Sequence, residues 1–471
     1  MTIAMKPFDA GWIYAEKPDA PAHFGPLIIL SLPEDAPVSF VCDLVEQWRQ
    51  CRHVEAPFNY RLRRGLWPSW QVLADEDIDL EYHLRHSALP APGGERELGT
   101  LISRLQSHAL DWQRPLWECH VIEGLENRRF AIYLKLHHGQ LDGMGAAKLI
   151  SRVFSADPAA RGGMPPWSVG MRAAGPRPVR QRISGWMRLM ALVQAWRALS
   201  RLKRDARSGR EPALAAPFQA PKTLFNERIS AQRRFATQRY PLERLKRIAK
   251  AGEVTLNDVF LASSGGALRR YLSELNALPA RTLIGQVPVN LRPAGDASVG
   301  NAIAFIYARL HSDLADPIAR LRAVHASMEA GKARHEALPA AAVEGFTMLL
   351  LGPYMLQIIL GLGGRVAPAA NLVISNLTGP RQRLYFNGAR VDHLYGPSVL
   401  FHGQALNITM SSYVDEINIG YTGCRASLPS MQRLAVYTGE ALDELESALG
   451  LADKAIPISM VSTRLPQEHA S

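Results

Sequence analysis

Two adjacent histidines, His137 and His138, precede Asp142 and Gly143 in the stretch KLHHGQLDGMG. Neutral imidazole is the side chain best suited to accept a proton near neutral pH. An aspartate four residues after His138 can close a turn, and the glycine that follows admits a close backbone approach. The stretch therefore indicates a general base held on a tight turn.

Two other interpretations of the histidine pair remain open. Histidine and aspartate are also metal ligands. Adjacent side chains on a strand point to opposite faces, however, so His137 and His138 would not readily share one ion, and we expect no metal. The pair could also cap the end of a strand through backbone hydrogen bonds, an interpretation that suits His137 best.

The segments around the pair predict a rigid mounting for it. Residues 115–138, PLWECHVIEGLENRRFAIYLKLHH, predict a hairpin that turns at ENRR. Alternating apolar residues (Ile132, Leu134, Leu136) indicate a strand with two different faces, and the histidines fall at its end. Residues 142–154 predict a helix with Asp142 at its N-cap.

The chain of 471 residues favours more than one domain. A Pro-, Gly- and Arg-rich connection at 161–221 separates two comparable halves, 1–160 and 222–458, and we expect a mobile tail at 459–471. Both halves predict a mixed α/β (α+β) fold. The second half predicts helices at 255–275 and 316–338, strands at 282–293, 301–312 and 371–380, and a hairpin at 405–423.

Positive charge gathers in the connection. The formal net charge is +11, and residues 171–210 hold eleven Lys and Arg side chains against one Asp. Residues 183–204 predict a helix whose first half is amphipathic and contains tryptophans. This helix could dock on the protein body by its apolar side or lie on an anionic membrane. Nucleic acid is a third partner for such charge, but no nucleic-acid fold surrounds it, so we expect none.

The uncharged stretch from Gly345 to Gly364 is about as long as a membrane span. Gly352 and Pro353 interrupt it, and Gln357 follows. We expect a kinked helix that is buried or lines the substrate site; a lipid-facing helix and a true span are the alternatives. The N-terminus lacks a secretory signal, and the four cysteines show no paired spacing, so we expect reduced thiols in a cytoplasmic protein.

Several segments together resemble one family. HHGQLDG is similar to the HHxxxDG motif of the bacterial wax ester synthase/acyl-CoA:diacylglycerol acyltransferases, and the match continues in order along nearly the whole chain. The other matching segments are FDAGWIYAEKPDAPAHFGPL, Pro115-Leu116-Trp117, Asn257-Asp258, PVNLRP and CRASLPSMQRLAVYTGEALDELE. ISNLTGP departs from the usual SNVPGP of the family at Leu377 and Thr378.

The resemblance implies two chloramphenicol-acetyltransferase-like domains, of the CoA-dependent acyltransferase type, with a central tunnel. It also implies that His138, as general base, activates the hydroxyl of a long-chain alcohol or diacylglycerol for attack on acyl-CoA. His137 would orient the site, and Asp142 and Gly143 would shape the turn. The resemblance makes Asn257 a candidate oxyanion or substrate donor, and Trp117 and Asp258 candidate substrate contacts. Without it, Thr255 to Asp258 is a capping box and Trp117 is hairpin core.

The expected partners are acyl-CoA as a substrate, a fatty alcohol and diacylglycerol, with no cofactor. Such acceptors live in membranes, so we expect peripheral contact with an anionic inner membrane or with lipid inclusions. Two alternatives remain: a condensation-type enzyme with a carrier-bound acyl donor, and a non-catalytic protein of lipid-droplet surfaces.

Overall fold

The computed structural model describes residues 1–171, 185–209, 211–290, 303–338 and 340–451. The expected tail at 459–471, the arginine-rich segment 172–184 and the end of PVNLRP lie outside the described residues. The first half of the chain contains β1 (Thr2–Ala4), α1 (Pro7–Ala15), β2 (His23–Phe24), β3 (Leu27–Ser31), α2 (Phe40–Gln50), β4 (Tyr60–Arg63), β5 (Ser69–Val72), α3 (Leu80–His83), β6 (Leu84–Ala88), α4 (Glu95–Ser107), β7 (Trp117–Leu125), β8 (Arg129–His137), α5 (Gly143–Val153) and α6 (Pro166–Val169).

The first half is built on a sheet of order β13-β14-β3-β8-β7-β6, with β2 paired to β8. Helices α2 and α5 cover one face and α4 covers the other, each through an apolar cluster. Strand β8 is therefore buried on both faces, and the predicted β7–β8 hairpin is present. A smaller sheet, β1-β5-β4, flanks this body.

The second half forms a sheet of order β11-β10-β12-β15-β16-β9, with β12 parallel to both its neighbours. Four of its helices bury their apolar faces in one cluster with the sheet, whereas the helix Ala340–Ile359 packs in a separate cluster. The elements after the connecting helix are β9 (Arg233–Pro241), α8 (Leu242–Ala251), α9 (Leu256–Glu274), β10 (Ile284–Asn290), β11 (Ile303–Arg309), α10 (Pro317–Glu336), α11 (Ala340–Ile359), β12 (Leu372–Thr378), β13 (Tyr385–Phe386), β14 (Ala389–Tyr395), β15 (Leu406–Tyr413), β16 (Glu416–Cys424) and α12 (Arg433–Ala448).

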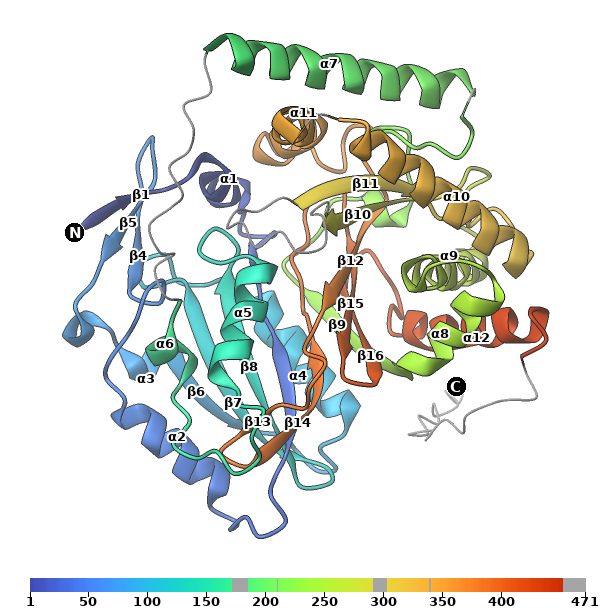
Figure 1. Cartoon of the computed structure of the whole chain (residues 1–471). Coiled ribbons are helices and arrows are strands. Elements are labelled where there is room, and N and C mark those ends of the chain that lie inside the picture. The colour runs from blue at the N-terminus through green and yellow to red at the C-terminus, as the bar shows by residue number, and fades with distance from the viewer. Residues whose placement is uncertain (172–184, 210, 291–302, 339, 452–471) are drawn as a thin grey trace, which may run out of the picture.

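Each half of the chain contributes strands that pack with the other half. Strands β13 and β14 belong to the second half of the sequence but join the sheet of the first half, where β14 pairs with β3 (Figure 1). In return, β9 packs against α4 through Phe235. The sequence division at 161–221 therefore does not follow the sheets strictly, because a local pattern does not reveal which distant strand completes an edge.

The connecting helix α7 (Gly185–Ser208) lies on the outside of the molecule, next to α11 (Figure 1). Its residues Ala195, Leu199 and Leu202 are buried in one cluster with residues of α11. Helix α11 runs through Pro353 and ends at Ile359, so most of this stretch lies in one helix with the proline inside it. Among the described residues, no helix combines the length and apolarity that a membrane span requires.

Candidate active site

The histidine turn leaves the end of β8 and enters α5. The backbone N–H of His138 donates to the carbonyl oxygen of Ala22 at 2.9 Å, and that of Gln140 donates to His137 at 3.0 Å. Asp142 occupies the N-cap of α5, where its carboxylate accepts from the Gly145 N–H at 2.7 Å. Strand pairing and the helix cap fix both ends of the turn, so the imidazoles start from a rigid backbone.

His137 is fully buried and points away from the cavity that His138 lines. Its Nε2 lies 2.6 Å from Glu16 Oε2, and its Nδ1 accepts from the Gly139 N–H at 3.0 Å. These contacts define the tautomer, with Nε2–H donating to the carboxylate. Glu16 also accepts from the indole N–H of Trp112 at 3.0 Å. His137 thus ties the turn to the segment that follows α1.

His138 lies between two aromatic rings at the wall of a cavity. The Trp12 ring stacks on its imidazole with centroids 3.7 Å apart, and the Phe24 ring is 4.9 Å away. Its Nδ1 is buried without a hydrogen-bond partner among the described residues. Nε2 is therefore the nitrogen left to face the cavity.

Burial decides the charge of His138. Desolvation lowers the pKa of the imidazole to about 4, although the Asp142 carboxylate acts in the opposite direction. The ring is consequently neutral at pH 7 and holds the lone pair that a general base needs. When it gains a proton during a reaction, the nearby carboxylate stabilises the new charge.

The cavity beside His138 has a volume of about 850 Å³ and is built by both halves of the chain. On one side lie His138, Phe24 and residues of α5. On the other lie hydroxyl-bearing and apolar residues of the second half, including Ser375, Leu377, Thr378, Pro380, Leu394, Pro397, Ser398, Thr409 and Ser411. The ISNLTGP segment thus lines the cavity in spite of its departure at Leu377 and Thr378.

Gly143 has a different role from the one its sequence position indicates. Its φ lies outside the left-handed region, and an added Cβ would meet only Leu377 Cδ2, at 3.9 Å. The turn itself therefore does not require glycine here. Gly143 lines the cavity, so the missing side chain leaves space on the substrate side. Gly139 is the crowded position, because a Cβ there would lie 2.9 Å from the Asp9 carbonyl oxygen.

The other motif residues lie away from the residues that line this cavity. Trp117 is fully buried, donates to the Phe58 carbonyl oxygen at 2.8 Å and stacks on His83. Asp258 closes the capping box of α9 with Thr255 and lies 2.8 Å from His325 Nδ1. These contacts place both side chains in the framework.

Asn257 lies at the first turn of α9, where its side-chain oxygen accepts from Asn376 at 3.2 Å. Asn376 sits on β12 between two cavity-lining residues, Ser375 and Leu377. Because successive side chains on a strand alternate in direction, Asn257 contacts β12 from the face opposite these two. It can therefore fix the strand but does not line the cavity.

Sequence reasoning did not single out Trp12 or Glu16, although both belong to the N-terminal segment that carries the resemblance. They meet the histidines across more than a hundred residues of sequence. The local signal is only a tryptophan within a short helix and an acidic residue just after it, which is common in any protein.

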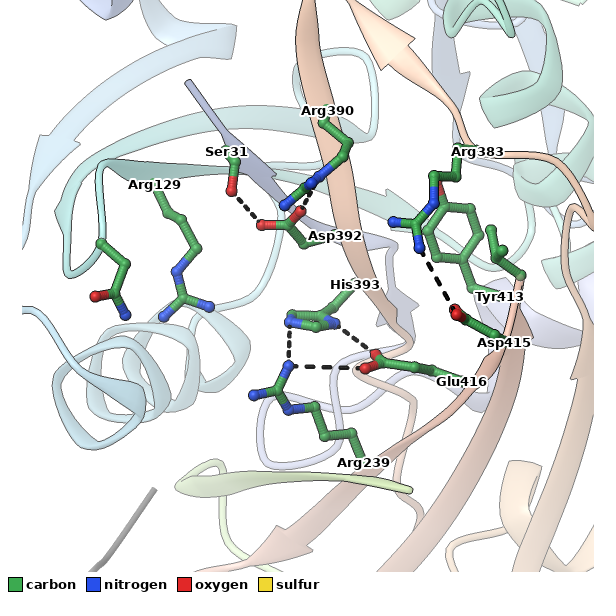
Figure 2. A pocket seen from close by; sticks show the side chains of 12 residues that line it. Ser31, Arg129, Arg239, Arg383, Arg390, Asp392, His393, Tyr413, Asp415 and Glu416 are labelled. Carbon is green, nitrogen blue, oxygen red and sulfur yellow. Dashed lines mark hydrogen bonds and ion pairs between the residues drawn. The ribbon is translucent and has the colours of Figure 1, made fainter. Parts of the chain in front are cut away.

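A second cavity, of about 320 Å³, lies between β14, β9 and the β15–β16 turn. Figure 2 shows three of its arginines paired: Arg239 contacts His393 and Glu416, Arg390 contacts Asp392, and Arg383 contacts Asp415. The fourth, Arg129, pairs with Glu126. This cavity is therefore a network of ion pairs where the two halves meet, rather than an open cationic site.

Comparison with known proteins agrees with this geometry. Residues 5–260 match the wax ester synthase/diacylglycerol acyltransferase catalytic domain, and residues 299–446 match the C-terminal domain of the same family. The chain belongs to this family. It is thus an O-acyltransferase, as the sequence predicts, and the predicted mixed α/β fold is confirmed.

Relatives with names cover almost the whole chain. The O-acyltransferase WSD of Acinetobacter baylyi is 39% identical, over 94% of this chain and 97% of its own. A putative diacylglycerol O-acyltransferase of Mycobacterium tuberculosis is 40% identical, over 95% and 97%. The structure of a wax ester synthase/diacylglycerol acyltransferase from Marinobacter aquaeolei VT8 matches with a TM-score of 0.78 and 35% identity, over 95% and 100%. A condensation domain of the CDA synthetase shares only the fold, with a TM-score of 0.60 and 16% identity over 97% of each chain.

Proposed function

We propose that this protein transfers a fatty acyl group from acyl-CoA to the hydroxyl of a long-chain alcohol, of diacylglycerol, or of both, with His138 as the general base. One observation carries the proposal. The neutral imidazole of His138, with Nδ1 buried and Nε2 toward the cavity, lies at the wall of a large cavity between the halves. The names of the relatives support the choice of substrates.

The reaction we propose is direct. His138 Nε2 takes the proton of the acceptor hydroxyl while its oxygen attacks the thioester carbonyl. The tetrahedral intermediate then collapses, the C–S bond breaks, and the imidazolium returns its proton to the leaving CoA thiolate. A thioester is already activated, so the chemistry asks only for a base and a donor to the oxyanion, without an added cofactor.

The oxyanion donor comes, in this proposal, from the second half of the chain. Ser375 and Ser411 line the cavity on neighbouring strands β12 and β15, and their hydroxyls have no hydrogen-bond partner among the described residues. Asn257 would then act through Asn376 by holding β12 in place, rather than by touching substrate. A donor of this kind typically contributes about 3 kcal/mol to the transition state.

The insoluble acceptors imply a lipid surface, and we propose one face for it. This docking face comprises exposed residues of α7, of α11 and the residue after it, of α1, and of the β4–β5 turn: Trp196, Arg197, Arg201, Arg204, Met348, Leu356, Leu360, Phe8, Tyr14, Leu66 and Trp67. Trp196 is 62% exposed, and Leu66 and Trp67 are 87% and 81% exposed. Large apolar side chains next to cationic ones are typical of proteins that lie on anionic membranes.

Contacts make this face continuous and connect it to the site. Helix α7 packs on α11, α11 packs on α1, and the Tyr14 hydroxyl donates to the Leu66 carbonyl oxygen at 2.5 Å. Trp12 of α1 stacks directly on His138. A lipid acceptor that leaves the surface near α1 would therefore approach the base. We accordingly propose peripheral association, from the cytoplasmic side, with the inner membrane or with lipid bodies.

The test is release of CoA from palmitoyl-CoA, followed with a thiol reagent, with dispersed hexadecanol or dioleoylglycerol as acceptor. We expect release that depends on acceptor, with the matching ester as product. A carrier-bound palmitoyl donor serves as the comparison. Release only from the carrier-bound donor would indicate a condensation-type enzyme. Lipid binding without release from either donor would indicate a protein of lipid surfaces, and both results contradict the proposal.

A further inference from the structure

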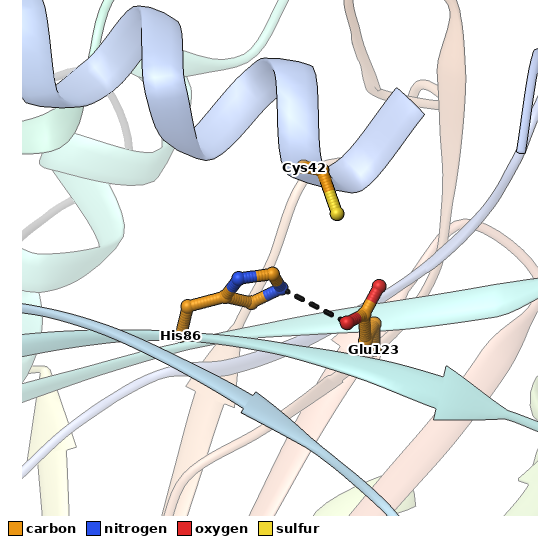
Figure 3. A group of neighbouring side chains, drawn as sticks. All are labelled: Cys42, His86 and Glu123. Atoms are coloured by element: carbon orange, nitrogen blue, oxygen red, sulfur yellow. Dashed lines mark ion pairs between the residues drawn. The ribbon is translucent and has the colours of Figure 1, made fainter. Parts of the chain in front are cut away.

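Three side chains that commonly bind metal ions meet on the first-half sheet, beneath α2. They are Cys42 from the first turn of α2, His86 from β6 and Glu123 from β7 (Figure 3). One ligand atom from each lies within 4.8 Å of the other two. None of the three lines the cavity beside His138.

Strand register explains why they meet. Strands β6 and β7 run parallel, with His86 opposite Val121, two residues before Glu123. His86 and Glu123 therefore point to the same face of the sheet, the face that α2 covers. Val41, Leu44 and Val45 of α2 are buried against that face, which leaves Cys42 at its edge above the two strands.

The chemistry of the three ligands favours one class of metal. A thiolate, an imidazole and a carboxylate are the ligand types of Zn²⁺, whereas a thiolate does not suit Mg²⁺ or Ca²⁺. Bond lengths of about 2.0–2.3 Å in a tetrahedron place ligand atoms roughly 3.3–3.8 Å apart. His86 Nε2 and Glu123 Oε1 are already 3.3 Å apart. Cys42 is exposed and Glu123 is partly exposed, so small rotations complete the arrangement.

We propose that Cys42, His86 and Glu123 bind one Zn²⁺ ion, with water at the fourth position, and that this ion clamps α2 to β6 and β7. The ion would tie together residues that stand 44 and 37 positions apart in the sequence. Because metal binds the folded form, it stabilises the first half of the molecule. The site is separate from acyl transfer, so its test does not depend on the proposed reaction.

A second histidine with acidic partners, His53, provides a matched control. His53 also lies near two carboxylates, but its Nδ1 and Nε2 each contact a different one, Asp75 and Glu55, both at 3.0 Å. This imidazole bridges the two carboxylates, one at each ring nitrogen, so the three groups do not converge on one metal position. Cys51 is the control for the thiol, since it is the other cysteine that is not buried.

The experiment uses the untagged full chain, stripped of metal and titrated with Zn²⁺ against a chromophoric chelator. We expect one tight equivalent in the wild type and in the controls His53→Ala and Cys51→Ser. Cys42→Ser, His86→Ala and Glu123→Gln should each weaken this equivalent by at least about tenfold. Co²⁺ in place of Zn²⁺ should give a thiolate charge-transfer band that only Cys42→Ser abolishes among the two cysteine variants.

Three results would overturn the proposal: no tight equivalent in the folded wild type, Co²⁺ bound without the thiolate band, or equal loss in Cys51→Ser. Cys42 is exposed, and Glu123→Gln keeps the shape of the side chain, so these variants should fold. Circular dichroism of the metal-free proteins checks this. A rise in melting temperature with Zn²⁺ in the wild type and in both controls, but not in the three site variants, would add support.

Discussion

At the scale of single residues, His137 and His138 have different roles because adjacent side chains at the end of a strand point in opposite directions. The His137 ring hydrogen-bonds to the Glu16 carboxylate and the Gly139 N–H, while the His138 ring stacks on Trp12 beside the cavity. The sequence predicts that the two rings face opposite ways, because the alternation of a strand is local. It does not predict their partners, because Trp12 and Glu16 arrive from a segment far away in the chain.

Trp12 should control the protonation of His138. Desolvation lowers the pKa of His138 to about 4, and only the neutral ring is a base, so activity falls as the pH drops through this pKa. Trp12→Ala would admit water and raise the pKa toward its ordinary value. We expect the acid limb of the kcat/KM profile to move upward by about one to two pH units.

Trp12→Phe is the control for this prediction, because it keeps an aromatic cover and should leave the acid limb near its wild-type position. An unchanged limb in Trp12→Ala, with activity reduced equally at every pH, would show that the indole acts only as packing.

At the scale of elements, motif residues and site residues differ. Asn257 and Asp258 form a recognisable pair, yet Asp258 caps α9 and contacts His325. The T-x-x-D spacing predicts this cap from the sequence alone. The helices and hairpins follow from apolar periodicity in the same way. The insertion of β14 beside β3 does not, because the pairing of strands so far apart in the sequence leaves no local trace.

Asp258→Ala should affect stability more than substrate binding. It removes the cap of α9 and the contact between the buried carboxylate and His325, so we expect the free energy of unfolding to fall by about 2 kcal/mol. Urea denaturation measures this loss. Asp316→Ala, which removes the more exposed cap of α10, should cost about 1 kcal/mol. A large rise in KM with unchanged stability would instead place Asp258 at the substrate.

At the scale of the whole molecule, the docking face connects the positive charge of α7 with the proposed binding to an anionic lipid surface. The sequence locates the excess charge but leaves open whether the helix docks or binds lipid. In the structure, one side of α7 packs on the protein and the other faces solvent. Ala195, Leu199 and Leu202 are buried on the first side, and Arg197 and Arg201 are exposed on the second. Which side is free depends on the contact with α11, which sequence periodicity cannot supply.

Removal of the arginines should weaken membrane binding. Each exposed Arg contributes about 1 kcal/mol near an anionic surface, so the triple change Arg197→Gln, Arg201→Gln, Arg204→Gln should reduce affinity for phosphatidylglycerol-containing vesicles by up to about two orders of magnitude. Vesicle sedimentation at several salt concentrations measures this. The same triple change at exposed Arg49, Arg52 and Arg425 is the control for charge. Equal loss in both triples would mean that net charge, and not this face, drives binding.

The central claim is that His138 is the base of an acyl transfer. The most direct measurement is the rate of CoA release from palmitoyl-CoA with the preferred acceptor, in wild type, His138→Ala and the surface control His53→Ala, each shown to be folded by circular dichroism. We predict that kcat/KM falls by roughly 10²–10⁴-fold in His138→Ala and stays unchanged in His53→Ala. A folded His138→Ala variant that keeps kcat/KM within about twofold of wild type would contradict the account, because a general base contributes far more than that.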